Sequence, residues 1–426
     1  MKFEAAFGAG TVAFEVPKGF DVECPSPAAP PEEPAAAAAR RALAAPSGSP
    51  PLEVRAKGAA DAVVVVPDAT RSCPSGEILP LLLDALERAS IPPARVTVLA
   101  ALGLHRGLTE AERAALLGPA AARGAAFAEH DAKGAIRDLG SGPGGAPLRV
   151  NERVAAAGFV VSLGVVEPHA YAGWSGGWKT VGIGCAGEET ISFTHSPRFI
   201  EHPRCRAGIV DGNPFVEVVK ENARRAGLKF ALNLVPGAGG GVVAAAAGDP
   251  GVAHRMLALR ARDAFALPVK APADVAVAGV GAPKDANLYQ ATRAATNLVL
   301  GAFEAVRPGG TILVVAACPE GTGTGTGETR FAESLRRGAA AVLADRNRAF
   351  LGGEQRAWAV AKVLQARRIV VVGSSLPPAD LRAMGLGAAA TVEEALKEAA
   401  GRGAKRLLVV PRALRALPVP AGGGRP

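Results

Sequence analysis

The sequence predicts an α/β protein made of two α/β domains with largely parallel sheets, and three observations support this. The chain has 426 residues, more than one ordinary hydrophobic core accommodates. Continuous β-branched runs occur, such as VVVV within residues 60–68, and these are typical of strands buried on both faces of a parallel sheet. Such runs alternate with segments of helical periodicity, which predicts strand–helix–strand units with right-handed crossovers.

The N-terminal part of the chain is predicted to open with a short hairpin of strands, because its first residues alternate between polar and apolar. Further strands and helices follow in an alternating series. We expect the hairpin over residues 1–17, strands at residues 60–68, 95–101 and 158–165, and helices at residues 35–45, 78–89 and 108–117.

A second α/β series begins after a proline-containing linker near residues 265–272. We expect strands at residues 273–280, 309–318, 367–372 and 406–410, and helices at residues 286–306 and 353–365. The linker places the domain boundary, and the active site is expected in the cleft between the domains. The predicted division is an N-terminal cofactor-binding catalytic domain of residues 1–268, a C-terminal α/β domain of residues 269–417, and a disordered tail of residues 418–426.

Composition excludes several classes of function. The net charge is +9, but the cationic residues form no run with interleaved aromatics, so we expect an anionic small-molecule substrate and not nucleic acid. No apolar stretch reaches the roughly 18 residues of a membrane span, and the N-terminus, which contains acids, does not resemble a signal peptide. The five cysteines are odd in number and lack metal-site spacing. These features predict a cytoplasmic protein that does not bind membranes.

Polar residues follow three of the predicted strands, where ligands bind in open parallel sheets. The segments are PDATRSCP, AALGLHRG and EPHAYAGWSGGWKT. Each has a purely structural interpretation: Asp68 in the first segment is typical of a helix N-cap, a single histidine such as His105 is more often structural, and the Ser-Gly-Gly of the third can be a simple turn. Their convergence at strand ends nevertheless indicates an active site.

The combination of these segments resembles the lactate racemase family. Residues 167–195 contain His169, then SGGWK ending at Lys179, then FTHSP centred on His195. PDATR, GLHR and NLYQATR stand in the order that the family shows, and the resemblance extends from the N-terminal hairpin to the final strand.

The resemblance implies an unusual cofactor and a specific site. Nickel is held by a pyridinium-3,5-bisthiocarboxylic acid mononucleotide, the nickel-pincer nucleotide, attached covalently to Lys179, with His195 as the nickel ligand from the protein. The acid–base residues are His105 and His169. The implied cofactor contacts are Asp68, Ala69, Thr70, Arg71, Ser175, Gly176 and Gly177, and the implied substrate contacts are Arg71, Trp178, Tyr289, Gln290 and Arg293.

The implied activity is inversion of C2 of a small 2-hydroxy acid through a 2-keto acid. Abstracting the C2 proton is difficult beside a carboxylate, whereas removing a hydride leaves a planar keto acid that can be reduced on either face. Two enantiomers then suggest two histidines that each take the hydroxyl proton. Proteins that synthesise the cofactor are the implied partners. A zinc hydrolase using His169 and His195, and a non-catalytic nickel- or nucleotide-binding protein, are the alternatives.

Two positions depart from the family pattern. Trp178 stands where arginine is common, and Arg293 stands where lysine is common, so the identity of the substrate is open. We expect His130, His202 and His254 to be structural or at the surface. Glu328, beside the Gly-Thr loop of residues 321–327, is expected to be solvated, and movement of that loop on binding is an open possibility.

Overall fold

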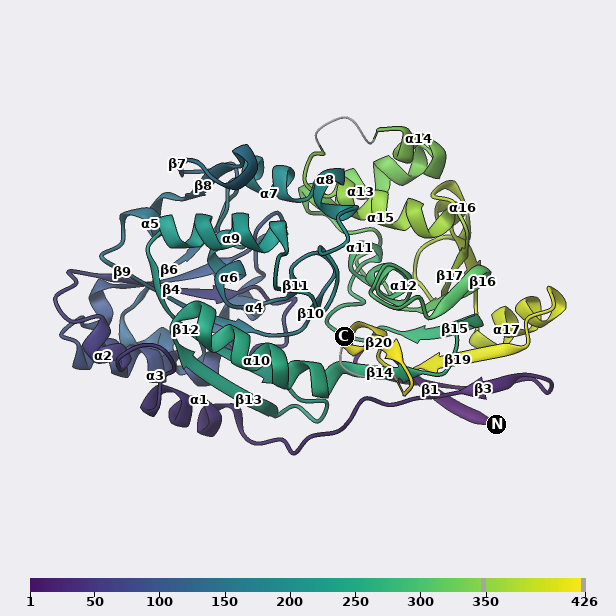
Figure 1. Cartoon of the computed structure of the whole chain (residues 1–426), viewed down its shortest axis with the longest axis horizontal. Coiled ribbons are helices and arrows are strands. Elements are labelled where there is room, and N and C mark those ends of the chain that lie inside the picture. Colours follow the sequence, from purple (N-terminus) through teal and green to yellow (C-terminus); the bar gives the residue numbers. More distant parts are fainter. Residues whose placement is uncertain (346–349, 423–426) are drawn as a thin grey trace. The chain divides into compact units, whose positions relative to one another are not determined.

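The computed structural model describes residues 1–345 and 350–422 and confirms the predicted α/β class with largely parallel sheets (Figure 1). The chain forms two compact units. We call them the N-terminal unit, which comprises Ala29–His195 and Ile209–Ala264, and the C-terminal unit, which comprises Met1–Ala28, Ser196–Gly208 and Phe265–Pro426.

The N-terminal unit is built on a six-stranded sheet with the order β13-β12-β9-β4-β5-β6. All neighbours are parallel except the edge pair of β12 and β13, which is antiparallel. The strands are β4 (Ala62–Pro67), β5 (Val96–Ala101), β6 (Ala126–Glu129), β9 (Phe159–Val165), β12 (Leu228–Pro236) and β13 (Val242–Gly248).

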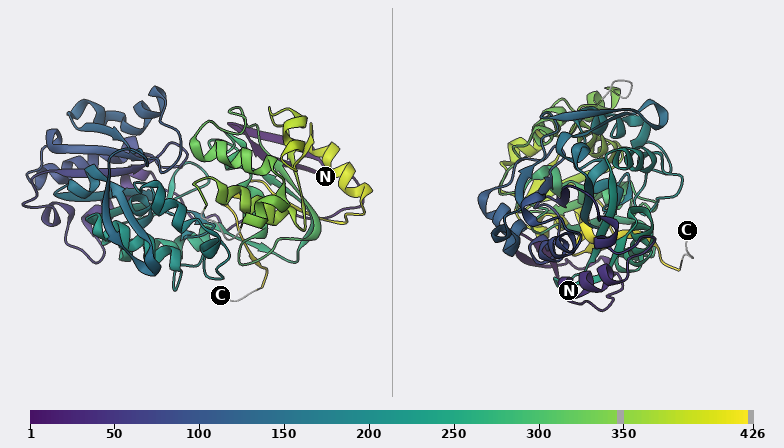
Figure 2. Two further views of the ribbon diagram at one scale, coloured as in Figure 1. Left: turned by 90° about the horizontal axis from the view of Figure 1, so that it is seen from above. Right: turned by 90° about the vertical axis from the view of Figure 1, so that its left-hand side faces the viewer.

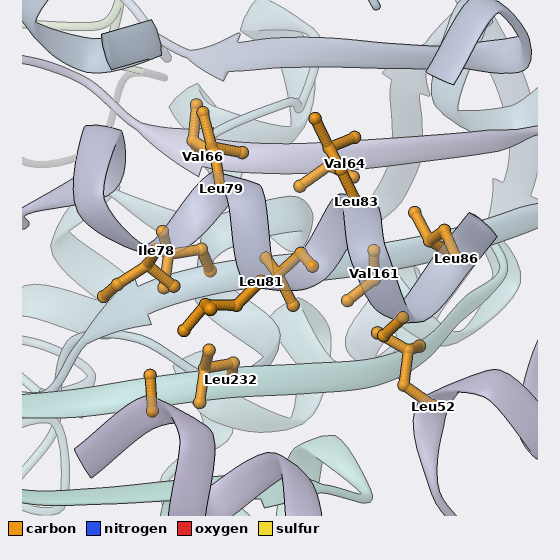
Figure 3. Close-up of a cluster of buried hydrophobic side chains, with 14 of the residues drawn as sticks. Leu52, Val64, Val66, Ile78, Leu79, Leu81, Leu83, Leu86, Val161 and Leu232 are labelled. Carbon is orange, nitrogen blue, oxygen red and sulfur yellow. The ribbon is translucent and has the colours of Figure 1, made fainter. Parts of the chain in front are cut away.

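Both faces of this sheet are buried, as the valine-rich strands predicted. In β4, Val64 and Val66 lie in a cluster with leucines of α3, as Figure 3 shows, whereas Val63 and Val65 pack on the other face near α6 and α9. Each fully buried Val or Leu side chain contributes about 1.5–3 kcal/mol. The middle of the sheet therefore has room for few polar groups, and functional side chains are confined to the strand ends.

Helices and short elements surround this sheet. The larger helices are α1 (Ala35–Ala44), α3 (Ser75–Arg88), α4 (Glu110–Leu117), α7 (Glu188–Thr194), α9 (Pro214–Arg225) and α10 (Pro250–Phe265). The shorter elements are α2 (Leu52–Arg55), α5 (Glu152–Ala156), α6 (Trp178–Gly182), the 3-10 turns Pro93–Arg95, Gly118–Arg123 and Pro143–Gly145, and the antiparallel pairs of β7 (Ile136–Ser141) with β8 (Pro147–Asn151) and β10 (Pro168–His169) with β11 (Gly173–Trp174).

The C-terminal unit contains a second, fully parallel sheet with the order β18-β17-β16-β15-β19-β3. Its strands are β3 (Asp21–Glu23), β15 (Ala273–Gly279), β16 (Val306–Val315), β17 (Arg368–Val372), β18 (Gly387–Ala389) and β19 (Arg406–Val410). The helices are α8 (Pro197–Ile200), α11 (Leu288–Ala291), α12 (Arg293–Val299), α13 (Thr326–Arg336), α14 (Ala339–Ala344), α15 (Glu354–Leu364), α16 (Pro378–Ala383) and α17 (Val392–Gly401), with a 3-10 turn at Ala413–Arg415.

The N-terminal hairpin forms as predicted, from β1 (Lys2–Phe7) and β2 (Gly10–Glu15), but it packs with the C-terminal sheet. Figure 1 and the left view of Figure 2 show its strands, in purple, beside the green and yellow elements. Residues 1–28 join the C-terminal unit because β3 hydrogen-bonds to β19 and because Ala5 and Phe14 share a core with Val275 and Leu313. Thus two segments of the predicted domain 1–268, residues 1–28 and 196–208, lie in the other unit.

Two further sequence-based expectations differ from the structure. The helix predicted over residues 286–306 is divided into α11 and α12 and ends at Val299, ahead of Gly301, and β16 already begins at Val306. The tail predicted to be disordered, residues 418–426, begins inside β20 (Leu417–Pro420), which pairs in parallel with β14 (Ala266–Val269). Residues 423–426 of that tail lie outside the described residues.

His130 and His254 are structural, as expected, but both are buried. His130 follows β6, its Nε2 donates to the Ala186 carbonyl at 3.0 Å, and its Nδ1 accepts from Asn151 at 3.2 Å. Burial lowers the pKa of His130 to about 4. Within residues 1–345 and 350–422, no helix is long and apolar enough to cross a membrane.

The pKa of His130 predicts a loss of stability in mild acid. The unfolded chain binds a proton at this imidazole near pH 6.5, whereas the folded protein does not until about pH 4. The stability contributed by neutral His130 is therefore complete above about pH 6.5 and is lost as the pH falls toward about 4. When the pH is lowered from about 7 to about 5, the free energy of unfolding of His130→Gln should fall by about 2 kcal/mol less than that of the parent protein. Urea unfolding at the two pH values measures this difference. His202→Gln, at a half-buried histidine, serves as the control, and equal pH dependence of all three proteins would contradict the assignment.

Candidate active site

The three polar segments meet at the carboxyl edge of the N-terminal sheet. Asp68 directly follows β4, His105 follows β5, and His169 lies in β10 just after β9. Because the strand order is β9-β4-β5, the segment that carries Asp68 lies between the segments that carry the two histidines. The parallel topology therefore brings together residues that are about a hundred positions apart in the sequence.

Asp68 and His105 form a hydrogen bond across neighbouring strands. His105 Nδ1 contacts Asp68 Oδ2, and Asp68 Oδ1 accepts from the Thr70 backbone N–H at 3.1 Å and from the Thr70 hydroxyl at 2.7 Å. Burial of the Asp68 carboxyl raises its pKa, but His105, Arg71 and Thr70 outweigh burial and hold that pKa well below its usual range. Asp68 is therefore a carboxylate whose two oxygens are both engaged within the protein.

The helix-cap interpretation of Asp68 is wrong. Helix α3 begins at Ser75 and its N-cap position is Pro74, so Asp68 lies outside the first turn of the helix. Its side chain instead forms a local turn with Thr70 and reaches across to His105. Arg71, Ala69 and Thr70 are half-buried beside this turn.

His169 has the opposite hydrogen-bonding pattern. Its Nδ1 accepts from the backbone N–H groups of Tyr171, at 3.3 Å, and Ala172, at 3.1 Å. The ring is half-buried and lies in β10, which pairs with β11 through the register His169–Gly173. Gly173 has φ +74° and a Cβ there would lie 2.3 Å from the Ile209 carbonyl oxygen, so only glycine fits and the turn that holds His169 stays tight.

Two aromatic residues bring His169 and His195 into one cluster. The Tyr171 ring lies 6.0 Å from the His169 ring and 5.8 Å from the His195 ring. The Phe215 ring lies 6.2 Å and 5.2 Å from the same two histidines. Neither residue is among those that the sequence motifs indicated. Tyr171 is only two positions after His169, which was a usable signal, but Phe215 is remote in sequence and nothing in the pattern indicated it.

Asn213 connects this cluster to helix α9. Its Oδ1 accepts from the backbone N–H groups of Phe215 and Val216 and so caps the helix. Its Nδ2 donates to the carbonyls of Tyr171, at 2.7 Å, and Ile209, at 3.0 Å. One buried side chain thus holds together the helix that carries Phe215 and the loop that carries His169.

His195 lies at the C-terminal end of α7 and is buried. Its Nδ1 contacts the Ile191 carbonyl at 2.8 Å and the Thr194 hydroxyl at 3.1 Å. A carbonyl oxygen only accepts, so the proton is on Nδ1 and Nε2 carries the lone pair, which is the arrangement that metal-binding histidines adopt. Within residues 1–345 and 350–422, no group of three or more His, Cys, Asp or Glu side chains is placed to hold a metal ion.

The Ser-Gly-Gly turn is a closely packed element. Gly176 and Gly177 have φ values of +77° and +53°, and a Cβ on either would lie 2.8 Å from Asn233 Oδ1 or 2.7 Å from the His254 ring. Asn233 Oδ1 accepts from the Gly177 N–H at 2.9 Å. The Ser175 hydroxyl donates to the Val165 carbonyl at 2.7 Å and accepts from the Glu167 N–H at 3.0 Å. These contacts fix the turn against the ends of β9 and β12.

Lys179 lies in the first turn of α6, immediately after this turn, and is half-buried. Helix α6 packs against α9 through Gly182, where a Cβ would lie 2.2 Å from the Val219 carbonyl oxygen. Trp178 is half-buried as well, and its indole approaches Gly251. The position of Lys179 is therefore set by two glycine contacts on either side of it.

The remaining predicted substrate residues lie in the C-terminal unit. Gln290 is buried and its Oε1 accepts from Arg293 at 3.3 Å. The Tyr289 hydroxyl accepts from Gln355 at 3.4 Å, and its ring packs on Phe331. Their contact with substrate, and the predicted active-site cleft between the domains, stay predictions.

Glu328 is buried, and the expectation of a solvated residue is wrong. Its Oε1 accepts from Asn287 at 3.2 Å and its Oε2 accepts from the Gly325 N–H at 2.8 Å. Asn287 Oδ1 in turn accepts from the Gln290 N–H at 3.0 Å, capping α11. The end of the Gly-Thr loop is thus tied to the segment that carries Gln290 and Arg293.

Two family models match the chain. The lactate racemase N-terminal domain matches residues 7–208 and the lactate racemase C-terminal domain matches residues 269–414. The lactate racemase of Thermoanaerobacterium thermosaccharolyticum is 32% identical over 372 residues, covering 84% of each chain, and that of Lactiplantibacillus plantarum is 33% identical over 288 residues, covering 66% of each.

Solved structures show the same fold. The lactate racemase apoprotein of T. thermosaccharolyticum superposes with a TM-score of 0.84 at 26% identity and covers 98% of this chain and 100% of its own. A Thermotoga maritima protein superposes with a TM-score of 0.66 at 19% identity, over 86% of this chain and 96% of its own, which shows a shared fold.

Asn213→Ala should destabilise the N-terminal unit more than an ordinary helix-cap deletion. The substitution removes the cap of α9 and leaves the carbonyls of Tyr171 and Ile209 without the Asn213 amide as donor. We therefore expect the free energy of unfolding to fall by about 2–4 kcal/mol. Thr391→Ala, which removes one cap bond to Glu394, should cost about 1 kcal/mol. Urea unfolding of the two variants and the parent measures both losses. Equal losses would mean that Asn213 is only a helix cap.

Proposed function

The chain belongs to the lactate racemase family, and on this premise we propose that it inverts C2 of lactate or a closely related small 2-hydroxy acid. The membership confirms the predicted resemblance and the predicted enzyme class, because the named relatives are isomerases. It also speaks against a zinc hydrolase and a non-catalytic binding protein, neither of which accounts for the racemase matches over both units.

The proposal depends mainly on one observation, the placement of His105 and His169 at the ends of β5 and β9, on either side of β4. Neighbouring strands are about 4.8 Å apart, so the ends of these two strands lie about 10 Å from each other. Both imidazoles follow buried strands, so the sheet holds them on rigid supports.

The reaction requires a hydride acceptor, and the residues of the site fit the family's nickel-pincer nucleotide. When bound, that group would supply an electron-poor centre able to take the C2 hydride and return it. His195 suits nickel because its Nδ1 hydrogen bond leaves Nε2 as the ligand nitrogen. Lys179, at the start of α6 beside the packed Ser-Gly-Gly turn, would carry the covalent attachment.

Other side chains of this unit would bind the nucleotide and the substrate. We infer that Ala69 and Thr70, together with the turn formed by Ser175, Gly176 and Gly177, bind the nucleotide mainly through their backbone, since the Ser175 hydroxyl is engaged by the protein. The guanidinium of half-buried Arg71 would bind the substrate carboxylate, because planar guanidinium groups form strong paired hydrogen bonds with carboxylates. Trp178 would limit the substrate side chain.

Racemisation of pure enantiomers tests the function directly. The protein, co-expressed with cofactor-synthesis enzymes, is incubated with L-lactate and separately with D-lactate, and chiral chromatography follows the opposite enantiomer. We expect both reactions to converge on an equal mixture. If the nickel-loaded protein converts neither lactate nor malate nor longer 2-hydroxy acids, the proposed activity is wrong. Nickel and nucleotide retained without conversion would favour the binding-protein alternative.

The attachment residue is tested by intact mass. The parent protein from the same co-expression should carry a covalent mass increase that Lys179→Ala lacks. Lys220→Ala, at an exposed lysine of α9, is the matched control and should keep the adduct. His195→Ala should also keep the adduct but lose most of its nickel, measured by metal analysis. An adduct that persists in Lys179→Ala would refute the attachment.

A further inference from the structure

Arg356, in helix α15 of the C-terminal unit, is a buried cation without an anionic partner. Its exposed fraction is 8%. The described residues include every Asp and Glu side chain of the chain, and none of them pairs with the Arg356 guanidinium. Burying a charge without a counter-charge is unfavourable, so the structure of this unit alone does not account for an arginine at this position.

Arg367 shows how a structural arginine is held in the same unit. It is equally buried, its Nε donates to the Val306 carbonyl at 2.8 Å, and its Nη2 contacts the Glu304 carboxylate. Arg356 has a single hydrogen bond to the described residues, from Nη1 to the Thr296 hydroxyl at 3.3 Å. Its Nε is buried without a partner. Within residues 1–345 and 350–422, the guanidinium edge formed by Nε and Nη2 therefore has no acceptor.

Two neighbours fix the orientation of the Arg356 guanidinium. Its Cζ lies 5.7 Å from the centre of the Tyr289 ring, a distance at which cation–π attraction acts, and that ring is itself held against Phe331. The Thr296 hydroxyl donates to the Arg293 carbonyl at 3.1 Å, so it has a lone pair left to accept from Arg356. The edge formed by Nε and Nη2 is therefore presented in one orientation.

This edge has the geometry that binds a carboxylate. Two N–H groups of a planar guanidinium point the same way and match the two oxygens of a carboxylate, whereas a single ammonium does not. Helix α15 packs on α12 (Figure 1), and Arg356 contacts Tyr289 and Thr296, the latter one helical turn after Arg293. Tyr289 and Arg293 are predicted substrate contacts, so the ligand of Arg356 is expected to be part of the substrate.

We propose that Arg356 binds a second carboxylate, at the end of the substrate side chain, and that the preferred substrate is therefore a 2-hydroxy dicarboxylate such as malate. Lactate has one carboxylate, which the proposed function assigns to Arg71, and would leave Arg356 without a partner. This inference rests on the proposed function and on the predicted substrate contacts of Tyr289 and Arg293. It makes Arg356 a specificity-determining residue.

Inversion requires that the side chain be bound in both enantiomers. When the C1 carboxylate and the C2–H bond keep their positions, the hydroxyl and the side chain exchange places between the two enantiomers. A distal carboxylate is then bound in two positions. Arg293, on the same side of α12 as Thr296, supplies a second guanidinium. In this proposal, Arg356 and Arg293 each bind the distal carboxylate of one enantiomer.

Thermal unfolding of the full-length, cofactor-loaded protein tests binding without any activity measurement. Malate should raise the melting temperature of the parent more than equal millimolar concentrations of lactate or of sulfate, a divalent anion that lacks a carboxylate. Arg356→Gln should lose this excess. Arg367→Gln, at an equally buried arginine that has its own carboxylate partner, is the matched control and should keep the excess even when the variant itself unfolds at a lower temperature. Equal stabilisation of the parent by malate, lactate and sulfate would overturn the proposal.

The specificity of the loaded enzyme adds a kinetic test. The ratio of kcat/KM for malate to kcat/KM for lactate should fall by about 10–100-fold in Arg356→Gln, because hydrogen bonds to a charged group are lost for malate alone. Arg356→Lys, which keeps the charge without the planar fork, should lose less than Arg356→Gln. Arg382→Gln, at an exposed arginine of α16, should leave the ratio unchanged. The same ratio in Arg356→Gln and the parent would overturn the proposal.

The two enantiomers of malate distinguish the two arginines. The equilibrium constant of racemisation is one, so any variant changes kcat/KM equally in both directions, and asymmetry can appear only in KM and kcat separately. Arg356→Gln should raise the KM of one enantiomer more than that of the other, and Arg293→Gln should show the reverse preference. Equal changes in KM for both enantiomers in both variants would refute the assignment of one arginine to each enantiomer. A parent enzyme that racemises no 2-hydroxy acid would instead refute the proposed function, and an excess stabilisation by malate that depends on Arg356 would still support the dicarboxylate site.

Discussion

The site of this protein depends on one constraint, the burial of the N-terminal parallel sheet on both faces. In β4, successive valines face opposite hydrophobic clusters, so a charged group within the strand would lose its hydration without gaining a partner. Charged groups that take part in chemistry are therefore confined to the strand ends. Because all the central strands are parallel, their carboxyl ends meet at one edge, and there Asp68 pairs with His105.

Close backbone packing supplies the precision that loops alone would lack. Gly173, Gly176 and Gly182 each stand where a Cβ would strike a carbonyl or amide group of a neighbouring segment. The loops after β9 consequently lie directly against β12 and α9. Asn233 and Asn213 then satisfy backbone groups of these loops with side-chain amides, which buried loops need in the absence of a regular ladder. These contacts fix the positions of Lys179 and His169.

Four histidines of the N-terminal unit show how hydrogen-bond partners determine which ring nitrogen carries the proton. His130 Nε2 and His195 Nδ1 each contact a carbonyl oxygen, His105 contacts a carboxylate, and His169 accepts from backbone N–H groups. The four rings are the same chemical group with different proton positions. A structural imidazole, a candidate nickel ligand and two candidate acid–base groups thus differ by the atoms that they face.

Much of this architecture follows from the sequence alone. Valine runs and helical periodicity predicted the strands β4, β5, β9, β15, β17 and β19 to within a few residues, because burial on both faces leaves a plain signal in composition. Motif order predicted the family and the strand ends that carry Asp68, His105 and His169. Only the tertiary structure decided which partners those side chains meet. Residues far apart in the chain come together in the Asp68–His105 pair, in the Tyr171–Phe215 contacts, around the buried Glu328, and where β3 joins the C-terminal sheet. Local sequence patterns do not predict such contacts, because long-range packing determines them.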